Sequence, residues 1–244
     1  AAFLLARQPV SRQNAAMSQL DLEPQDKMPR GAPLAELLRP QRLVDVVGQD
    51  KLIGPDGRLR RMLDQDELAS IIFWGPPGTG KTTTARLLAD EAGMAFEPVS
   101  AVFDGVADLR KVFARAADRL KTGERTLLFV DEVHRFNKAQ QDGLLPRVED
   151  GTVTLVGATT ENPSFALNGA LLSRAQVMVL ERLSLTALQA LLARVEAHAG
   201  HFLPLEADAR EALVAMADGD GRYLLNMASA LLRAPQDQMI GTDK

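Results

Sequence analysis

The sequence predicts an α/β fold, a parallel sheet flanked by helices and followed by a small all-helical unit. Three observations predict it. Strand-like apolar runs alternate with helical segments up to about residue 182, the order of a parallel sheet with helices on both faces. Residues 126–130 are almost wholly apolar, as in a strand buried on both faces. From Ser184 onward, leucine and alanine recur at helical spacing and no strand signal remains.

The elements follow in order. Residues 1–32 hold several prolines and no sustained period, so we expect a flexible N-terminal arm. A helix-like piece at 34–38 and a turn at 54–57 come first in the α/β core, which we place at residues 33–182. The core pattern predicts strands at 71–74, 95–100, 126–130, 152–158 and 176–180, and helices at 58–68, 80–92, 105–121, 137–149 and 167–173. Helices at 185–199, 206–217 and 222–233 form a lid unit at 183–234, and residues 235–244 form a polar tail.

The composition excludes several classes of protein. The 244 residues suffice for one large domain, or for one domain and a smaller one. A net charge of −4 gives no global basic field for nucleic acid, although it is compatible with a local basic face. The absence of cysteine excludes a disulfide framework, a cysteine-ligated zinc module and a catalytic thiol. No apolar run approaches the roughly 20 residues that span a bilayer, so we expect a soluble cytoplasmic protein.

A glycine-rich segment between the first strand and its helix is typical of a phosphate-binding loop. It reads Gly75-Pro76-Pro77-Gly78-Thr79-Gly80-Lys81-Thr82-Thr83, and we expect all nine residues to contact a nucleotide. The glycines let backbone N–H groups approach a polyphosphate, and the helix start adds unpaired N–H groups. Lys81 would reach the β- and γ-phosphates, and Thr82 would hold Mg²⁺. The alternative is a chance glycine-rich turn, which this context disfavours.

An apolar segment ahead of the loop is the candidate for the nucleotide base. Residues 43–47 are largely apolar and are followed directly by Gly48. An apolar segment of this kind can pack against the flat faces of a purine. We therefore expect nucleotide contacts from Arg39, Val47 and Gly48. Ordinary packing of a lead-in segment is the alternative.

Two acids follow the buried strand 126–130 directly. The carboxyl ends of parallel strands are where open α/β sheets bind ligands. Asp131 would hold Mg²⁺ together with Thr82, and Glu132 would orient and deprotonate an attacking water. A solvated acidic turn is the alternative.

Further polar residues are candidates for sensing the γ-phosphate. Thr160, at the tip of the next strand, is the expected sensor, with Thr159 as the second choice. Ser100 either holds Glu132 in an off state or caps a turn. Arg222 begins the last lid helix, from which it can fold over the γ-phosphate of its own subunit, unless it is simply an exposed helix-start residue.

The residues described so far resemble an AAA+ ATPase of the clamp-loader clade. More narrowly, they resemble the replication-associated recombination protein A family, whose eukaryotic relatives are the Werner-helicase-interacting ATPases. AAA+ proteins in general share the phosphate loop and Asp131-Glu132, so the narrower resemblance depends on the runs at 134–138 and 161–165. Further matching segments lie at 33–49, 73–83, 139–151, 157–160 and 171–175. The resemblance covers about residues 33–233.

The resemblance implies a DNA-stimulated ATPase, with ATP and Mg²⁺, acting at stalled replication forks in replication-coupled repair and recombination. It implies a location at the nucleoid, binding to forked, gapped or single-stranded DNA ends, and contact with single-strand-binding protein or the sliding clamp. It also implies a homo-oligomer, a tetramer or larger, formed through a C-terminal region that we expect to be absent here. Arg174 would then act as an arginine finger on a neighbour's ATP, whereas without the family it is a surface arginine at a helix end.

Three smaller features keep two interpretations each. Residues 19–22, Gln-Leu-Asp-Leu, resemble the bacterial clamp-binding peptide with Glu23 in place of the final aromatic residue; a solvated tail is the alternative. His134 and Arg135 either link DNA contact to Glu132 or are structural. Lys138 and Arg147 either contact the DNA backbone or solvate a surface.

The function also keeps an alternative, an ATP-switched clamp-loader-type subunit or adaptor with little motor activity. The zinc module of the bacterial loader needs cysteines, which this chain lacks. A Holliday-junction branch-migration motor does not match the run at 161–165.

Overall fold

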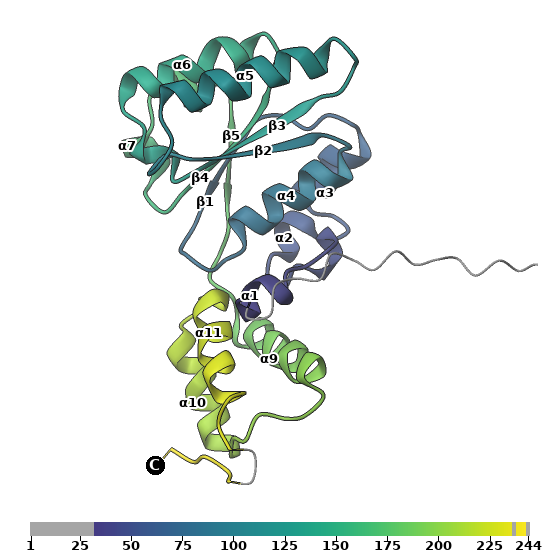
Figure 1. Ribbon diagram of the computed structural model, residues 1–244, viewed down its shortest axis with the longest axis vertical. Coiled ribbons are helices and arrows are strands. Elements are labelled where there is room, and N and C mark those ends of the chain that lie inside the picture. The colour runs from purple at the N-terminus through teal and green to yellow at the C-terminus, as the bar shows by residue number, and fades with distance from the viewer. Residues whose placement is uncertain (1–31, 236–237, 243–244) are drawn as a thin grey trace, which may run out of the picture. The chain divides into compact units, whose positions relative to one another are not determined.

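A computed structural model describes residues 32–235 and 238–242. Contacts divide the chain into two units, Ala1–Ala32 and Pro33–Lys244, and every element below lies in the second. The segment at 19–22 that resembles a clamp-binding peptide lies outside the described residues. The second unit contains a five-stranded sheet with helices on both faces and three further helices after it (Figure 1). The predicted fold class is confirmed.

All five strands of the sheet are parallel and lie in the order β2-β3-β4-β1-β5. Their bounds are β1 Ile71–Trp74, β2 Ala95–Ser100, β3 Thr126–Asp131, β4 Thr154–Thr159 and β5 Gln176–Val179. Along this order, the connection from β1 leads toward the β2 end of the sheet, whereas the connections from β2, β3 and β4 lead toward the β5 end. The connections from the adjacent strands β1 and β4 therefore leave in opposite directions. Open α/β sheets bind ligands in the crevice that forms at such a point.

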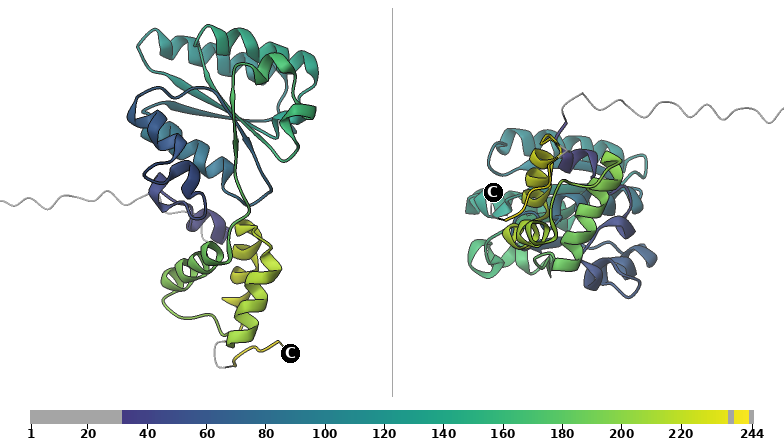
Figure 2. Two further views of the ribbon diagram at one scale, coloured as in Figure 1. Left: turned by 180° about the vertical axis from the view of Figure 1, so that it is seen from behind. Right: turned by 90° about the horizontal axis from the view of Figure 1, so that it is seen from below.

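Helices cover the two faces of the sheet in pairs. On one face lie α3 (Arg58–Asp64) and α4 (Lys81–Glu91), and on the other lie α5 (Val106–Leu120) and α6 (Lys138–Glu149) (Figures 1 and 2). Alternate residues of β3 point to opposite faces, so Leu127 and Phe129 join the core on the α4 side while Leu128 and Val130 join that on the α5 side. Burial on both faces explains why this strand is apolar without alternation.

Three helices form the lid: α9 (Leu185–Ala199), α10 (Ala207–Ala217) and α11 (Gly221–Leu231). They pack around a core of their own that includes Leu188, Leu192 and Leu224. The short helix α1 (Leu34–Leu37) packs into this cluster through Leu34, although the sequence places it with the residues of the α/β core. The first residues of the described chain therefore bind the lid, a long-range contact that no local pattern indicates.

Several element boundaries differ from the sequence prediction. The short helix predicted at 167–173 is present as α8 (Gly169–Leu172), capped by Asn168. The sequence prediction missed α7 (Pro163–Ala166), a separate helical turn that Asn162 caps. Helix α3 ends at Asp64 rather than at 68, since Asp66 adopts a positive φ of 52°. β4 begins and ends later than the predicted strand at 152–158. The turns η1 (Leu43–Asp45), α2 (Asp50–Ile53) and η2 (Val133–Arg135) gave no sequence signal.

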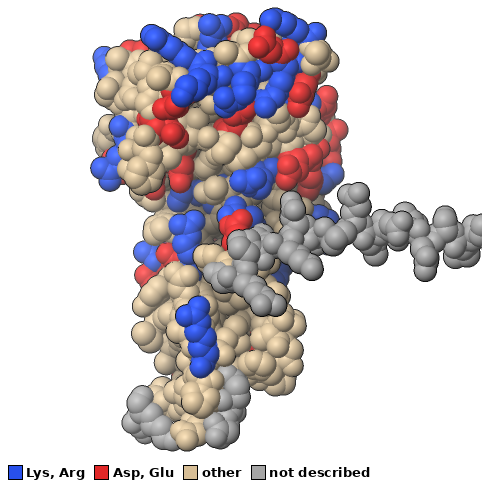
Figure 3. Space-filling model, viewed as in Figure 1, with Lys and Arg blue, Asp and Glu red and all other residues tan. Residues whose placement is uncertain are grey.

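Basic side chains gather over α5 on the face drawn in Figure 3. Most of those on α5 and just after it are ion-paired, in the pairs Lys111–Asp108, Arg115–Glu97, Arg119–Glu97 and Lys121–Asp118. Their acidic partners offset much of the positive charge. This patch alone is therefore no argument for a nucleic-acid surface.

The buried Glu97 makes a pH-dependent contribution to stability. Its carboxylate accepts from Arg115 at 2.6 and 2.9 Å and from Arg119 at 2.6 Å, and these bonds, that of Arg115 first, hold the pKa of Glu97 below its usual 4.5. Because the folded pKa is lowered, the stabilisation is present above the unfolded pKa and is lost as the pH falls through the folded value.

We expect Glu97→Gln to lower the free energy of unfolding by about 2 kcal/mol at neutral pH, between the values for exposed and buried ion pairs. The variant should also lose less stability than the wild type on acidification. Urea unfolding followed by circular dichroism at several pH values measures both effects, with the exposed Glu67→Gln as control. Equal acid dependence of wild type and Glu97→Gln would contradict this account.

Candidate functional site

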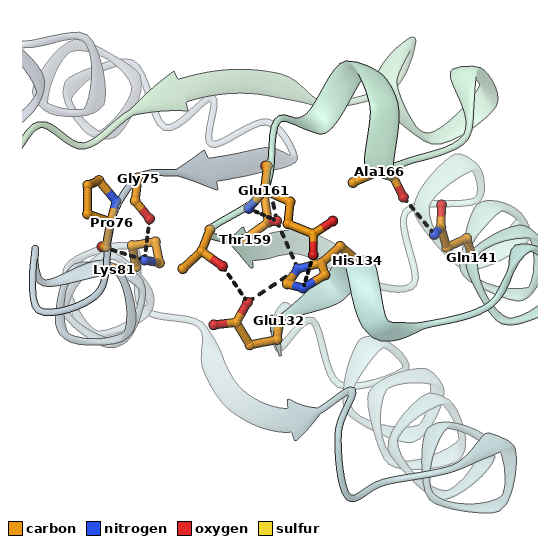
Figure 4. Close-up of polar contacts among 10 residues, drawn as sticks. Gly75, Pro76, Lys81, Glu132, His134, Gln141, Thr159, Glu161 and Ala166 are labelled. Atoms are coloured by element: carbon orange, nitrogen blue, oxygen red, sulfur yellow. Dashed lines mark hydrogen bonds and ion pairs between the residues drawn. The ribbon is translucent and has the colours of Figure 1, made fainter.

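The loop between β1 and α4 encloses the amino group of a buried lysine. The side chain of Lys81 turns back so that Nζ donates to the carbonyl oxygens of Gly75 at 2.7 Å and Pro76 at 2.8 Å (Figure 4). Lys81 is 9% exposed. Burial lowers the pKa of Lys81, and the nearby charges of Glu132 and Asp131 oppose that shift. The loop therefore keeps a cation close to two carboxylates at the N-terminus of α4.

The start of α11 closes one side of this loop. A Cβ on Gly78, whose φ is +69°, would lie 1.8 Å from Oδ1 of Asp220. The N–H of Gly221 donates to the carbonyl of Gly78 at 3.2 Å, and Asp220 caps α11 by accepting from the N–H of Tyr223 at 2.9 Å. Only glycine fits at position 78, since both the backbone angle and the space exclude a side chain. The lid thus touches the loop beside Arg222.

A cavity of about 550 Å³ adjoins the loop. Residues 77–83, Asp131, Glu132 and Arg222 line it, as the sequence analysis expects of a nucleotide site. Its cationic lining residues are Arg39, Lys81, Arg194 and Arg222, and its acidic ones are Glu36, Asp131 and Glu132. Its aliphatic lining includes Val46, Val47, Leu183, Leu191 and Leu225. The cavity therefore combines cations suited to a polyphosphate with an apolar wall suited to a base.

The predicted base contacts divide into two groups. Arg39 and Val47 line the cavity, and the Nε of Arg39 is buried without a hydrogen-bond partner in the part of the chain that the structure describes. Gly48 instead packs against Leu183, the first residue of the lid. A Cβ on Gly48 would lie 2.8 Å from Cδ2 of Leu183. Val46, which belongs to the predicted segment 43–47, lines the cavity as well. The sequence missed Arg194 on α9, because the face that a lid helix turns to the cavity depends on packing.

Glu132 lies at the carboxyl edge of the sheet in a constrained position. Its φ of 52° is left-handed, which costs a non-glycine residue roughly 1–2 kcal/mol. Its Oε2 lies 3.5 Å from the hydroxyl of Thr160. The same oxygen lies 3.2 Å from Nδ1 of His134 (Figure 4). Thr159 is fully buried, and its hydroxyl contacts Nδ1 of His134 at 2.9 Å. Of the two threonines, Thr160 is thus the one whose hydroxyl faces Glu132.

Ser100 makes no contact with Glu132 among the described residues. It pairs with Asp131 in the sheet register, and its backbone N–H donates to the carboxylate of Asp104 at 2.7 Å. In residues 32–235, the recorded side-chain contacts of Glu132 are those with Thr160 and His134. The plain turn interpretation of Ser100 fits this arrangement.

The two candidate arginines lie at opposite edges of the sheet. Arg174 precedes β5, whose first residue Gln176 pairs with Ile71 at the start of β1, so Arg174 lies at the amino edge and the phosphate loop at the other. Nε of Arg174 contacts Oε1 of Glu149 at 2.5 Å. Arg222 is the second residue of α11 and lines the cavity.

The candidate DNA-contacting residues lie on the surface. Arg135 and Lys138 are exposed after β3, and Arg147 pairs with Asp150 at 3.1 Å. Two phenylalanines that the sequence analysis did not single out are also exposed: Phe103, 88% exposed after β2, and Phe165, 91% exposed on α7. Three adjacent strands therefore end in loops that carry exposed basic or aromatic side chains.

Comparisons with known proteins agree with this site. The sequence family described as "ATPase family associated with various cellular activities (AAA)" matches residues 71–183. The chain is 46% identical over 199 residues to Replication-associated recombination protein A of Escherichia coli (strain K12), and 51% identical over 200 residues to the protein of that name from Coxiella burnetii. It is 42% identical over 211 residues to ATPase WRNIP1 of Dictyostelium discoideum.

These alignments cover most of this chain but only part of each relative. They span 80%, 80% and 85% of the chain, and 44%, 45% and 24% of the respective relatives. The chain thus spans less than half the length of these curated relatives.

Among solved structures, the fold resembles the Thermotoga maritima RuvB Holliday junction branch migration motor. The TM-score is 0.64 at 26% identity, over 83% of this chain and 69% of that one. In the described part of the chain, no helix has the length and apolar character needed to cross a membrane.

Proposed function

Since the chain belongs to the replication-associated recombination protein A family of AAA+ ATPases, we propose that it binds and hydrolyses ATP with Mg²⁺ in replication-coupled repair and recombination. One observation carries this proposal. The phosphate loop, its buried Lys81 and the acids Asp131 and Glu132 border a single cavity into which the lid contributes Arg222. Residues 33–182 act as the ATPase core in this proposal and residues 183–234 as its lid.

The lining of the cavity fits a triphosphate. Backbone N–H groups of the loop and the cations Lys81 and Arg222 would hold the phosphates, and the unpartnered Nε of Arg39 is a donor still to be satisfied there. The aliphatic side chains of Val46 and Val47 would contact the base.

The donor set also fits Mg²⁺. This ion needs only one or two protein ligands when phosphate oxygens and water complete its shell, and Thr82 and Asp131 supply them. Across the described residues, no group of three or more histidines and carboxylates is arranged to hold a metal alone. Bound Mg²⁺ would supply charge neutralisation at the phosphate oxygens.

The hydrolytic roles follow from where the residues lie. Glu132, at the cavity wall, orients a water and accepts its proton. Thr160, whose hydroxyl faces Glu132, senses the γ-phosphate or that water. Arg222 closes over the phosphates from its own lid, so the lid angle depends on the nucleotide.

Arg174 completes a neighbouring site in an oligomer of this chain, as a tetramer or larger. At the amino edge of the sheet, Arg174 lies away from the phosphate loop of its own subunit. In the absence of a neighbour it pairs with Glu149, and the more negative phosphates of a neighbour's ATP would replace that partner. We expect Arg174→Ala to leave the affinity of the isolated chain for ATP unchanged and to lower turnover only where subunits assemble.

The DNA partner in this proposal is a forked, gapped or single-stranded end, and the protein acts at the nucleoid. The exposed Arg135 and Lys138 contact phosphates, and the exposed Phe103 and Phe165 offer faces on which unpaired bases stack. Single-strand-binding protein and the sliding clamp are further partners that this function would use.

The test is ATP turnover measured with and without forked DNA, on this chain and on a version extended to the length of the relatives. We expect hydrolysis by the extended form to rise when DNA is added, and we expect Arg174→Ala to abolish that rise. Turnover that ignores DNA in the extended form would favour the ATP-switched loader or adaptor instead. If neither this chain nor the extended version binds ATP, the proposal as a whole is overturned.

A further inference from the structure

A buried histidine connects Glu132 to the loop after β4. His134 lies in η2, and its side chain is 4% exposed. Its Nδ1 lies 3.2 Å from Oε2 of Glu132, and its Nε2 lies 3.3 Å from Oε1 of Glu161 (Figure 4). The imidazole thus stands between two carboxylates, one at the wall of the cavity and one in the loop that follows β4.

The hydroxyl of Thr159 contacts the same ring nitrogen as Glu132 does. This hydroxyl gives its one hydrogen to the carbonyl of Glu161 at 3.2 Å, and it accepts the N–H of Glu161 at 3.0 Å. It also lies 2.9 Å from Nδ1 of His134. With that hydrogen on the carbonyl, the hydroxyl accepts from Nδ1, and Oε2 of Glu132, 3.2 Å from Nδ1, is a carboxylate oxygen that also accepts; we therefore assign the hydrogen to Nδ1. The same N–H faces Oε2 of Glu132.

We propose that His134 is a positioning residue for Glu132. Its Nδ1–H, together with the hydroxyl of Thr160, holds Oε2, and this leaves Oε1 for the water that Glu132 activates. Glu161 and Thr159 fix the ring in turn. A base oriented by a third group in this way presents one oxygen in a single direction. This inference rests on the proposed function, since it assigns Glu132 as the base.

Three substitutions of His134 separate positioning from simple packing. The amide nitrogen of asparagine falls near the place of Nδ1, and that of glutamine near the place of Nε2. We expect His134→Ala and His134→Gln to lower kcat for ATP by about 10- to 100-fold, with KM within about twofold, because only alignment of the base is lost. His134→Asn should stay within about threefold of the wild type. The exposed His198→Gln on α9 is the matched control.

A nucleotide-free measurement tests the contacts themselves. The chain has three histidines, so the ring ¹⁵N resonances of His134 can be assigned from their loss in His134→Gln. We expect Glu132→Gln to shift the Nδ1 resonance of His134 and Glu161→Gln to shift the Nε2 resonance. Ring resonances that respond to neither substitution would overturn the proposal.

The kinetic outcomes also distinguish the two levels of proposal. Equal loss of kcat in all three His134 variants, accompanied by equal loss of Tm, would make the residue structural and overturn the positioning role. Unchanged kcat in His134→Ala would overturn it too, while the ATPase proposal stands. If the wild type binds ATP but does not hydrolyse it, the catalytic part of the proposed function fails, and with it the role assigned to His134, even where the resonances confirm the contacts.

Discussion

Replacing Glu132 with glutamine is expected to leave ATP binding intact and to lower turnover at least about 100-fold. Glutamine has the shape of glutamate, so the contact with the hydroxyl of Thr160 persists through the amide oxygen. The amide, however, cannot accept a proton from water, and general-base catalysis is worth about 10²- to 10⁴-fold. Because the substitution removes one negative charge beside the phosphates, the variant should bind ATP as tightly as the wild type or more tightly.

Two measurements check this prediction. Calorimetry with ATP and Mg²⁺ gives the affinity, and phosphate release gives the turnover. Glu124→Gln serves as the control, because Glu124 is exposed and lies before β3, whereas Glu132 lies at the other end of that strand. Turnover of Glu132→Gln within about fivefold of the wild type would show that another group activates the water.

Lys81→Met is expected to weaken ATP binding at least about 100-fold, which is about 2.7 kcal/mol of binding free energy. Methionine keeps the length and the apolar stem of lysine but loses the charge that faces the cavity. It also loses the two bonds by which Nζ holds the carbonyls of Gly75 and Pro76. The phosphate loop would therefore lose both its cation and part of its internal support.

Binding and stability should be measured together for this variant. Each carbonyl left without its donor costs about 1–3 kcal/mol if it stays buried, whereas removal of a buried charge offsets part of that loss. We expect a lower Tm by differential scanning calorimetry, with the chain still folded. The control is Lys51→Met, whose side chain is 80% exposed and pairs with Glu181. ATP affinity of Lys81→Met within about threefold of the wild type would remove Lys81 from the site.

The sequence by itself determined the features that local physics controls. A strand buried on both faces must be apolar throughout, and β3 is. A phosphate loop must turn at positive φ, and Gly78 and Gly80 do so. Asp131 and Glu132 had to emerge where a parallel strand ends, and the start of α11 at Gly221 follows from Asp220 as its cap. Each of these features depends on neighbours within a few residues.

Only the tertiary structure decided which distant segments meet. It placed β4 between β1 and β3, so the phosphate loop, the two acids and Thr160 share one edge. It also packed Leu34 into the lid, turned Arg194 to the cavity, and set His134 between two glutamates. Such contacts depend on which faces of helices and sheet bury against each other. That choice is made by the packing of the whole chain, and periodicity within one segment carries no record of it.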